Sequence, residues 1–196
     1  GIITKIVLRL LPHPTHDVLF LVPFFDANTA CAAVPAIFKA GIIPSGMEFM
    51  ERDALLWAKA FTGDETIPVA DNHQAHLLIE LDGFDQDQLM REAEQLFLVL
   101  EAFETDEILF ADSAAQKAAL WNLRRKVGEA VKTQSTYKEE DTVVPRYQLP
   151  NLLTSVKAVG ARYGFKSVCY GHAGDGNLHV NIIRGELSDE KWEYEL

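Results

Sequence analysis

The chain has 196 residues, of which 48% are hydrophobic and 24% charged, and its formal net charge is −11. This length allows one sizeable core or two small ones, and the composition is that of an ordinary globular protein. The acidic balance argues against a nucleic-acid partner, because binding to a phosphate backbone draws on clustered lysines and arginines. The two cysteines, Cys31 and Cys169, lie far apart in the sequence. We therefore expect two buried thiols in a reducing cytoplasm rather than a disulfide framework.

In chain order, residues 1–11 open in an alternating strand pattern whose pairing partners are expected upstream. Strands then alternate with single helices: a strand at 18–22, a helix from 26 to 40, a strand at 46–50, a helical segment at 53–61, a strand at 76–81, a helix at 86–101, a strand at 107–110 and a helix from 113 to 132. An irregular stretch follows, then a helix at 150–163, a hairpin over 166–183, and a helix capped by Ser188 that the end of the chain cuts short.

This alternation leaves two kinds of sheet to be weighed. Strands separated by single helices are typical of a parallel sheet, but no Gly-x-Gly-x-x-Gly follows the first strand and the last two strands are expected to form a hairpin. We therefore predict an α+β fold, with an antiparallel sheet and helices packed mainly on one face.

The most informative segment runs from His172 to His179 (HAGDGNLH) and places two imidazoles on either side of an Asp-Gly turn. Asp-Gly between β-forming runs is a strong hairpin signal. With Asp175 and Gly176 as the two turn residues, His172 would pair directly with His179, at a Cβ separation of roughly 4.5–5.5 Å. One divalent ion could then bind both rings. Period two adds Tyr170 and Asn181 to this face; the competing interpretation is a pair of solvated histidines.

Residues 171–179 (GHAGDGNLH) resemble the signature of the FAD-linked oxidases, a family that includes the glycolate oxidase flavoprotein subunit, D-lactate dehydrogenase and D-2-hydroxyglutarate dehydrogenase. Further segments resemble the same family in the expected order, at 1–12, 43–50, 120–124 and 139–146. The resemblance implies that residues 1–14 are the tail end of a flavin-binding domain. Residues 15–196 would be a substrate or cap domain, related to ferredoxin-like folds and truncated at its C-terminus. The chain would thus be a fragment of a larger flavoprotein.

The resemblance also implies a reaction. A D-2-hydroxy acid (glycolate, D-lactate or D-2-hydroxyglutarate) would be oxidised to the 2-oxo acid, with hydride passing to FAD bound by the missing domain. His172 and His179 would hold a divalent metal, zinc with manganese or iron as alternatives, that acts as a Lewis acid on the substrate. The family's glutamate ligand and its general-base histidine, in a Gly-Glu-His-Gly segment, would fall beyond Leu196. No catalytic residue is therefore assigned in this chain, which alone is expected to be inactive.

Three residues are candidates for substrate binding. Arg124 occupies the Trp-x-x-Arg position, where the resemblance implies a two-pronged grip on the substrate carboxylate; a solvated surface arginine is the competing interpretation. Asn181 is included because it shares the face of the histidines. Lys138 is a weaker candidate for a second carboxylate, because it lies one residue too far from the Val-Pro turn. The acidic run 139–141 is interpreted as an exposed charged turn.

Two other classes of function remain open at this stage. One is a non-catalytic metal-binding or interaction module, and the other is a hydrolytic metalloenzyme, against which the missing third ligand and the absence of His-Glu-x-x-His argue. The expected partners are a 2-hydroxy acid, the missing flavin-binding domain and a second copy of the chain, while the electron acceptor stays open. The expected location is cytoplasmic, with the intact enzyme at the inner face of the membrane as an alternative.

Overall fold

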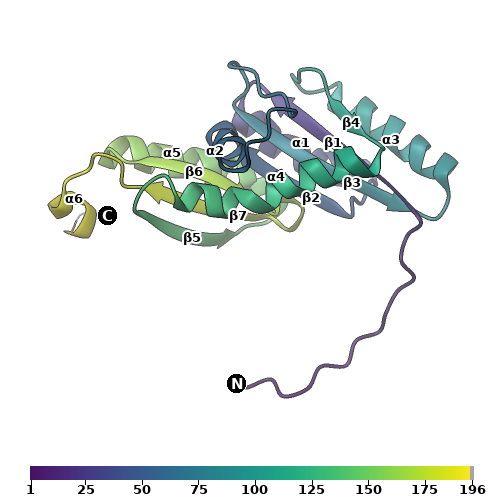
Figure 1. Ribbon diagram of the computed structural model, residues 1–196, viewed down its shortest axis with the longest axis horizontal. Helices are drawn as coiled ribbons and strands as arrows, with labels where there is room; N and C mark the ends of the chain where they lie inside the picture. The colour runs from purple at the N-terminus through teal and green to yellow at the C-terminus, as the bar shows by residue number, and fades with distance from the viewer. Residues whose placement is uncertain (195–196) are drawn as a thin grey trace.

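The computed structural model describes residues 1–194, and its centre is a seven-stranded sheet in the order β4-β1-β3-β2-β6-β7-β5 (Figure 1). Every pairing is antiparallel, which confirms the predicted sheet. The strands are β1 (His16–Phe24), β2 (Gly46–Glu51), β3 (Ala75–Gly83), β4 (Leu109–Ala111), β5 (Tyr137–Val143), β6 (Lys166–Gly171) and β7 (Asn177–Ile183).

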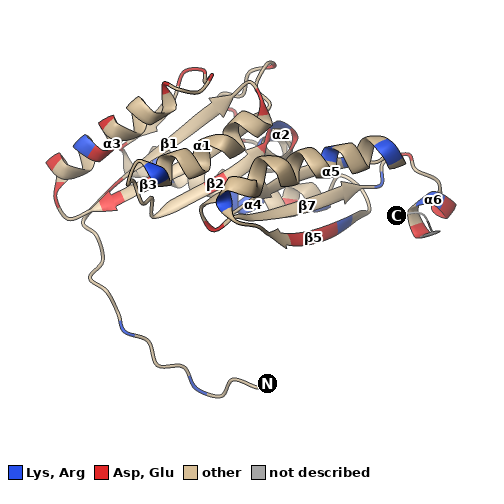
Figure 2. Cartoon of the chain, turned by 180° about the vertical axis from the view of Figure 1, so that it is seen from behind, with Lys and Arg blue, Asp and Glu red and all other residues tan. Residues whose placement is uncertain are grey.

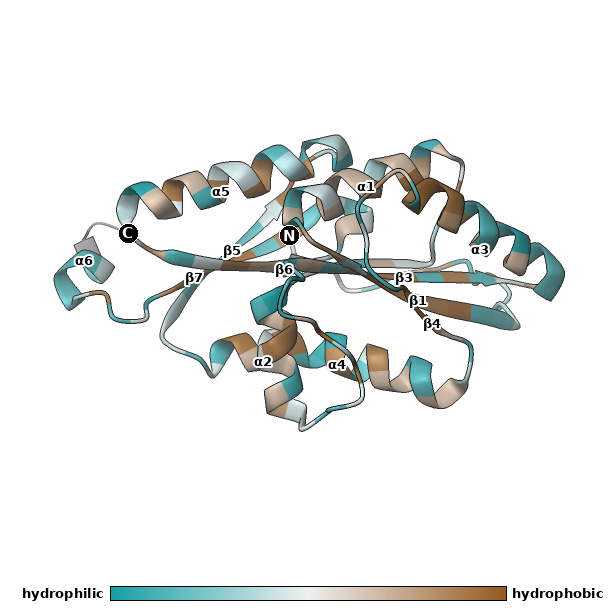
Figure 3. Ribbon diagram, turned by 90° about the horizontal axis from the view of Figure 1, so that it is seen from above, coloured by the Kyte–Doolittle hydropathy of each residue, from teal (hydrophilic) through white to brown (hydrophobic). Residues whose placement is uncertain are grey.

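Helices cover both faces of this sheet (Figure 3). One face carries α1 (Ala27–Lys39), α3 (Gln86–Leu100) and α5 (Leu149–Tyr163), and the other carries α2 (Arg52–Thr62) and α4 (Ala114–Lys132). The short helix α6 (Asp189–Tyr194) follows the sheet, and the remainder of the predicted C-terminal helix, 195–196, lies outside the described residues. The sequence analysis predicts helices mainly on one face, whereas the structure has three helices on one face and two on the other.

The central strands explain why both faces need a helix layer. Every residue of β1 from Val18 to Phe24 is buried, so its side chains are apolar on both sides of the sheet. Phe20 and Val22 belong to one hydrophobic core, whereas Leu19 and Leu21 belong to a second core on the opposite face. The second core also contains residues of β2, β6, α2 and α4, and it underlies the candidate site.

The caps and thiols follow the sequence. Asp26 and Ser113 accept hydrogen bonds from backbone amides at the starts of α1 and α4, and Ser188 does the same for α6.

Cys31 and Cys169 are free and buried. Burial raises the pKa of both thiols, that of Cys169 to about 12. None of the helices in residues 1–194 has the length and apolarity needed to cross a bilayer.

The N-terminal segment differs from its predicted strand. Residues 1–14 form an extended arm that leaves the body of the molecule without strand pairing (Figure 1). A strand is defined by hydrogen bonds to a neighbour, and no neighbouring strand lies beside the arm in residues 1–194. Its apolar side chains are 67 to 94% exposed: Ile2, Ile3, Ile6, Val7, Leu8, Leu10 and Leu11.

The acidic run 139–141 is a strand and not the charged turn that the sequence predicts. It lies in the middle of β5, which pairs with β7 along its whole length and forms one edge of the sheet. In Figure 2 the ribbon of β5 is coloured red along this acidic run. Edge strands commonly carry charged residues, which discourage pairing with other chains. Low β-propensity therefore concealed a strand whose position depends on β7.

The histidine hairpin has a longer turn than Asp175 and Gly176 alone. Tyr170, not His172, pairs with His179, so the predicted register is wrong by two residues. The amide of Asp175 donates to the His172 carbonyl and that of Gly176 to the Ala173 carbonyl, so a 3-10 turn, Ala173–Asp175, occupies the tip. A shift of two residues preserves the face on which a side chain lies. The histidines therefore stay on the same side of the sheet.

Gly176 is expected to be indispensable to this turn. Its φ is +75°, and a Cβ added there would overlap the carbonyl oxygen of Val144. Gly63 has a similar φ of +69° but open space around it. We expect Gly63→Ala to lower the free energy of unfolding by about 1–2 kcal/mol, because alanine is strained in the left-handed backbone conformation. Gly176→Ala should lower it by roughly 1–3 kcal/mol more, because its Cβ also overlaps a neighbouring atom. Urea unfolding measures both, and equal losses would contradict the steric argument.

Candidate functional site

The candidate site lies where β2, β6 and β7 run side by side on the face covered by α2 and α4. Tyr170 on β6 pairs with Met50 on one side and with His179 on the other, so these three side chains form a row across the sheet. The Tyr170 ring stacks on the His179 ring with 5.3 Å between centroids. The His172 and His179 rings lie 6.1 Å apart, centroid to centroid, and almost perpendicular to one another. The structure thus brings the two predicted histidines together.

His172 is held by a carboxylate on the neighbouring strand. Continuing the β2–β6 register beyond Phe49 and Gly171 places His172 opposite Glu48. The Glu48 Oε1 atom lies 2.8 Å from His172 Nδ1. Because a carboxylate only accepts hydrogen bonds, Nδ1 is the donor and Nε2 of the neutral ring is left with its lone pair.

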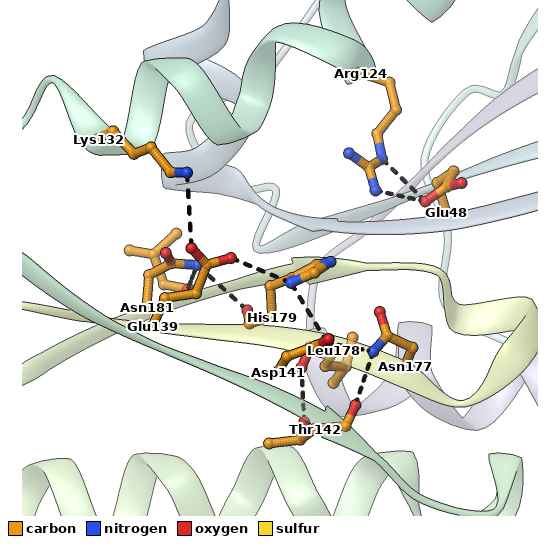
Figure 4. Close-up of polar contacts among 11 residues, drawn as sticks. Glu48, Arg124, Lys132, Glu139, Asp141, Thr142, Asn177, Leu178, His179 and Asn181 are labelled. Carbon is orange, nitrogen blue, oxygen red and sulfur yellow. Dashed lines mark hydrogen bonds and ion pairs between the residues drawn. The ribbon is translucent and has the colours of Figure 1, made fainter. Parts of the chain in front are cut away.

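Figure 4 shows that His179 also faces carboxylates, which come from the edge strand β5. Its Nδ1 lies 3.2 Å from Glu139 Oε1 and 3.6 Å from Asp141 Oδ1, although neither contact has hydrogen-bond geometry. Asp141 is opposite His179 in the β5–β7 register, and Glu139 is opposite Asn181. Sequence reasoning missed both acidic residues because it placed them in a turn. Glu139 and Asp141 are two residues apart, which puts both side chains on one face if the segment is a strand. This spacing was the signal available in the sequence.

Arg124 on α4 is buried, so its interpretation as a solvated surface residue is wrong. It is 8% exposed, and its Nε and Nη2 atoms donate to Glu48 Oε2 at 3.0 and 2.7 Å (Figure 4). The guanidinium carbon also lies 5.6 Å from the centroid of the Tyr170 ring. Glu48 was missed in the sequence because its direct neighbours on β2, Met47 and Phe49, are apolar and its partners lie far from it in the sequence. A charged residue between apolar neighbours in a strand was the signal that could have found it.

The other two substrate candidates separate. Asn181 is fully buried on the histidine face, where its Nδ2 atom lies 3.4 Å from the Val168 carbonyl oxygen. Its Oδ1 atom has no hydrogen-bond partner within residues 1–194. Lys138 lies on the opposite face of β5, because side chains alternate along a strand. Its ammonium donates to the Trp192 carbonyl at 2.7 Å and lies 4.8 Å from the indole centroid, so the structure does not bring Lys138 to the histidines.

The environment keeps Tyr170 a neutral phenol. Burial raises the pKa of its hydroxyl, and the Glu139 carboxylate raises this pKa further. Beside the site, a cavity of about 400 Å³ is lined by Glu48 and His172 together with Pro44, Arg146 and Asp175. A small polar molecule therefore has space next to the Glu48 and His172 side chains.

The two histidines fit a divalent metal as two of its ligands. Histidines that bind metals commonly direct their second ring nitrogen to a carboxylate, which orients the ring. Here Nδ1 of His172 faces Glu48 and Nδ1 of His179 faces Glu139. Within the part of the chain that the structure describes, no group of three or more His, Cys, Asp and Glu side chains is arranged around one point.

A second cavity, of about 420 Å³, lies toward the opposite edge of the sheet, beside β1, β3 and β4. It is lined by His73 and His76 among mainly apolar residues. The Ala70 amide donates to His73 Nδ1 at 3.1 Å, so His73 Nε2 carries the hydrogen that binds Asp106, at 3.0 Å. His76 is fully buried, and neither of its ring nitrogens has a partner among residues 1–194. Burial and the neighbouring His73 lower the pKa of His76 to about 3.

Buried His76 is expected to make the chain sensitive to acid. The unfolded imidazole takes up a proton near pH 6.5, whereas the folded one stays neutral down to about pH 3. The unfolded state therefore binds more protons in this window, and stability falls as pH drops through it. We expect His76→Leu to flatten the decline of Tm between about pH 6.5 and 4.5. His13→Leu, on the exposed arm, is the control, and a His76→Leu profile parallel to wild type would refute the argument.

Comparison with known proteins identifies the family. Residues 13–195 match the family model described as FAD linked oxidases, C-terminal domain, and the chain belongs to this family. It is 31% identical to a D-lactate dehydrogenase of Anaerostipes hadrus over 98% of this chain and 42% of that protein. It is 30% identical to the glycolate oxidase subunit GlcD of Escherichia coli strain K12 over 93% of this chain and 36% of that protein.

A third relative, the D-2-hydroxyglutarate dehydrogenase of Xanthomonas citri pv. viticola, is 29% identical over 97% of this chain and 40% of its own length. The chain thus spans about 36 to 42% of these three relatives. Among solved structures, p-cresol methylhydroxylase with substrate bound superposes with a TM-score of 0.64 at 12% identity, over 92% of this chain and 41% of that one. An alkyldihydroxyacetonephosphate synthase gives 0.60 at 14% identity, over 86% and 35%. These likenesses show the fold.

Proposed function

We propose that this chain is the substrate-side domain of an FAD-dependent dehydrogenase that oxidises a D-2-hydroxy acid to the 2-oxo acid. Family membership supports an FAD-linked oxidoreductase, and relatives named for D-lactate, glycolate and D-2-hydroxyglutarate support the substrate class. The observation that carries the proposal is the junction at Glu48, which holds Arg124 and His172 on one face beside His179. This arrangement supports a carboxylate-binding role for Arg124 and a metal-binding role for the two histidines beside it.

Each residue of this cluster has a distinct role in the proposal. Arg124 binds the carboxylate of the hydroxy acid through charge-assisted hydrogen bonds. His172 and His179 hold a divalent metal, zinc with manganese or iron as alternatives. Asn181 stays a candidate for substrate binding, because its amide oxygen lies on the same face and has no hydrogen-bond partner within residues 1–194. When bound, the metal supplies Lewis-acid polarisation of the substrate hydroxyl. Lys138 is left out, because it lies on the other face of β5.

The rest of the enzyme lies outside this unit in the proposal. FAD would be bound by a separate domain, to which residues 1–14 belong as its tail end, while residues 15–196 form the substrate domain. The exposed apolar side chains of the arm support this division, because such surface is normally covered by a partner. Contact between copies of the chain through the same surface is the alternative.

The first expectation is that the 196-residue chain, purified alone, folds but is colourless and inactive. No glycine-rich dinucleotide loop is present in the sequence, and two hydrophobic cores are already closed by the described residues. Absorbance of bound flavin and reduction of a dye by D-lactate, glycolate or D-2-hydroxyglutarate test this. A stoichiometric flavin spectrum, or dye reduction above that of a heat-treated sample, would refute the division into two domains.

The second expectation concerns Arg124 in the flavin-containing protein. Arg124→Ala should raise KM for the hydroxy acid and lower kcat/KM. The loss of transition-state stabilisation calculated from kcat/KM should be roughly 1.5–3 kcal/mol, the contribution of a hydrogen bond to a charged group. Arg125→Ala is a matched control, because Arg125 is exposed on the same helix. Steady-state kinetics of preparations with equal flavin content measure both. Equal and small effects would exclude a carboxylate-binding role for Arg124.

A further inference from the structure

Glu48 is a buried carboxylate whose two oxygens have different partners. The residue is 7% exposed, and its strand places it between helix α4 and the turn that follows β6. Oε2 accepts from Nε and Nη2 of Arg124, at 3.0 and 2.7 Å, whereas Oε1 lies 2.8 Å from Nδ1 of His172. One side chain therefore joins the arginine and a histidine that the proposed function assigns to different parts of the substrate.

We propose that Glu48 is a positioning residue that sets both the tautomer of His172 and the orientation of Arg124. The inference rests on the proposed function for its purpose, but its geometry does not depend on a bound metal or substrate. Two consequences follow, one for each partner of the carboxylate.

The first consequence is a fixed tautomer of His172. A neutral imidazole carries its hydrogen on either nitrogen, and the hydrogen bond of one nitrogen decides the other. Glu48 can only accept, so the hydrogen stays on Nδ1 of His172 and the lone pair on Nε2. No hydrogen bond to Nε2 of His172 is formed within residues 1–194, which leaves this atom free to bind an ion.

The second consequence is that Glu48 binds one edge of the Arg124 guanidinium and leaves the other edge for a substrate. Nε and Nη2 form the lateral edge of Arg124, and Glu48 occupies it. The terminal edge of the guanidinium, with both hydrogens of Nη1 and one hydrogen of Nη2, is not used by Glu48. Nη1 has no hydrogen bond among the described residues. This edge matches the two oxygens of a carboxylate. Glu48 also neutralises the buried arginine before any substrate arrives, which removes the cost of an unpaired buried charge.

The substitution Glu48→Gln gives a sharp test, because glutamine has one acceptor where glutamate has two. Arg124 has only donors and will take the amide oxygen, so the amide NH₂ group is turned toward His172. Nδ1 of His172 must then accept, and the hydrogen moves to Nε2. The variant is therefore expected to reverse the tautomer of His172 rather than merely weaken a contact.

Nitrogen NMR of the histidine-labelled 196-residue chain reads this tautomer without metal, at a pH where the ring is neutral. The expected result is hydrogen on Nδ1 in the wild type and on Nε2 in Glu48→Gln. Glu51→Gln is the matched control: Glu51 is on the same strand, 8% exposed and paired with Lys157 at 2.7 Å, but its carboxylate faces away from the histidines. It should leave the His172 signal unchanged. Hydrogen on Nε2 in the wild type would overturn the proposal, even if the Glu48→Gln chain did not fold.

Calorimetric titration with Zn²⁺ is the second readout. Glu48→Gln should weaken Zn²⁺ binding by about 10–100-fold, as expected when the carboxylate that orients a metal-binding histidine is lost, and Glu51→Gln should not. If the wild-type chain binds no Zn²⁺, its two histidines do not hold the ion without a further ligand, and the tautomer of His172 alone decides the role of Glu48. Equal Zn²⁺ affinity in wild type and Glu48→Gln, together with an unchanged tautomer, would reduce Glu48 to a structural ion pair.

Discussion

Antiparallel pairing of β2, β6, β7 and β5 is the constraint on which the site depends. In such a sheet, residues opposite one another point to the same face, so one register aligns side chains from four strands. Met50, Tyr170, His179 and Asp141 fall into one row in this way, and Glu48 falls beside His172. A slip of one residue on any of these strands would turn its polar groups to the wrong face. The chemistry of the cluster is therefore a product of strand register.

Burial then determines the strength of the contacts in that cluster. Arg124 and Glu48 are both less than 10% exposed, and removing two charges from water is costly unless each is well paired. A single carboxylate that contacts both a guanidinium and an imidazole meets this condition. Other polar atoms on the same face, His179 Nδ1 and Asn181 Oδ1, have no hydrogen-bond partner within residues 1–194. Such uncompensated groups concentrate where a protein binds something, because function, not stability, explains them.

The layered architecture gives this cluster a rigid base. Helix α4 packs against the second core through its apolar stripe, and the same helix carries Arg124 to Glu48. The cluster thus combines side chains of a helix, a central strand and a hairpin, none of which could hold it alone.

Local sequence determined the helices, most strands and the motif, because caps, periodic apolar residues and the Asp-Gly turn are properties of short segments. It also predicted that His172 and His179 share a face, since a register error of two residues preserves the side. Only the tertiary structure decided that 137–143 is a strand, because its acidic residues gain their partners from β7. The same holds for Glu48, whose contacts with Arg124 and His172 span 76 and 124 residues of sequence. Contacts between residues so far apart in the sequence cannot be predicted from a local pattern, because they form only when the sheet brings its strands into register.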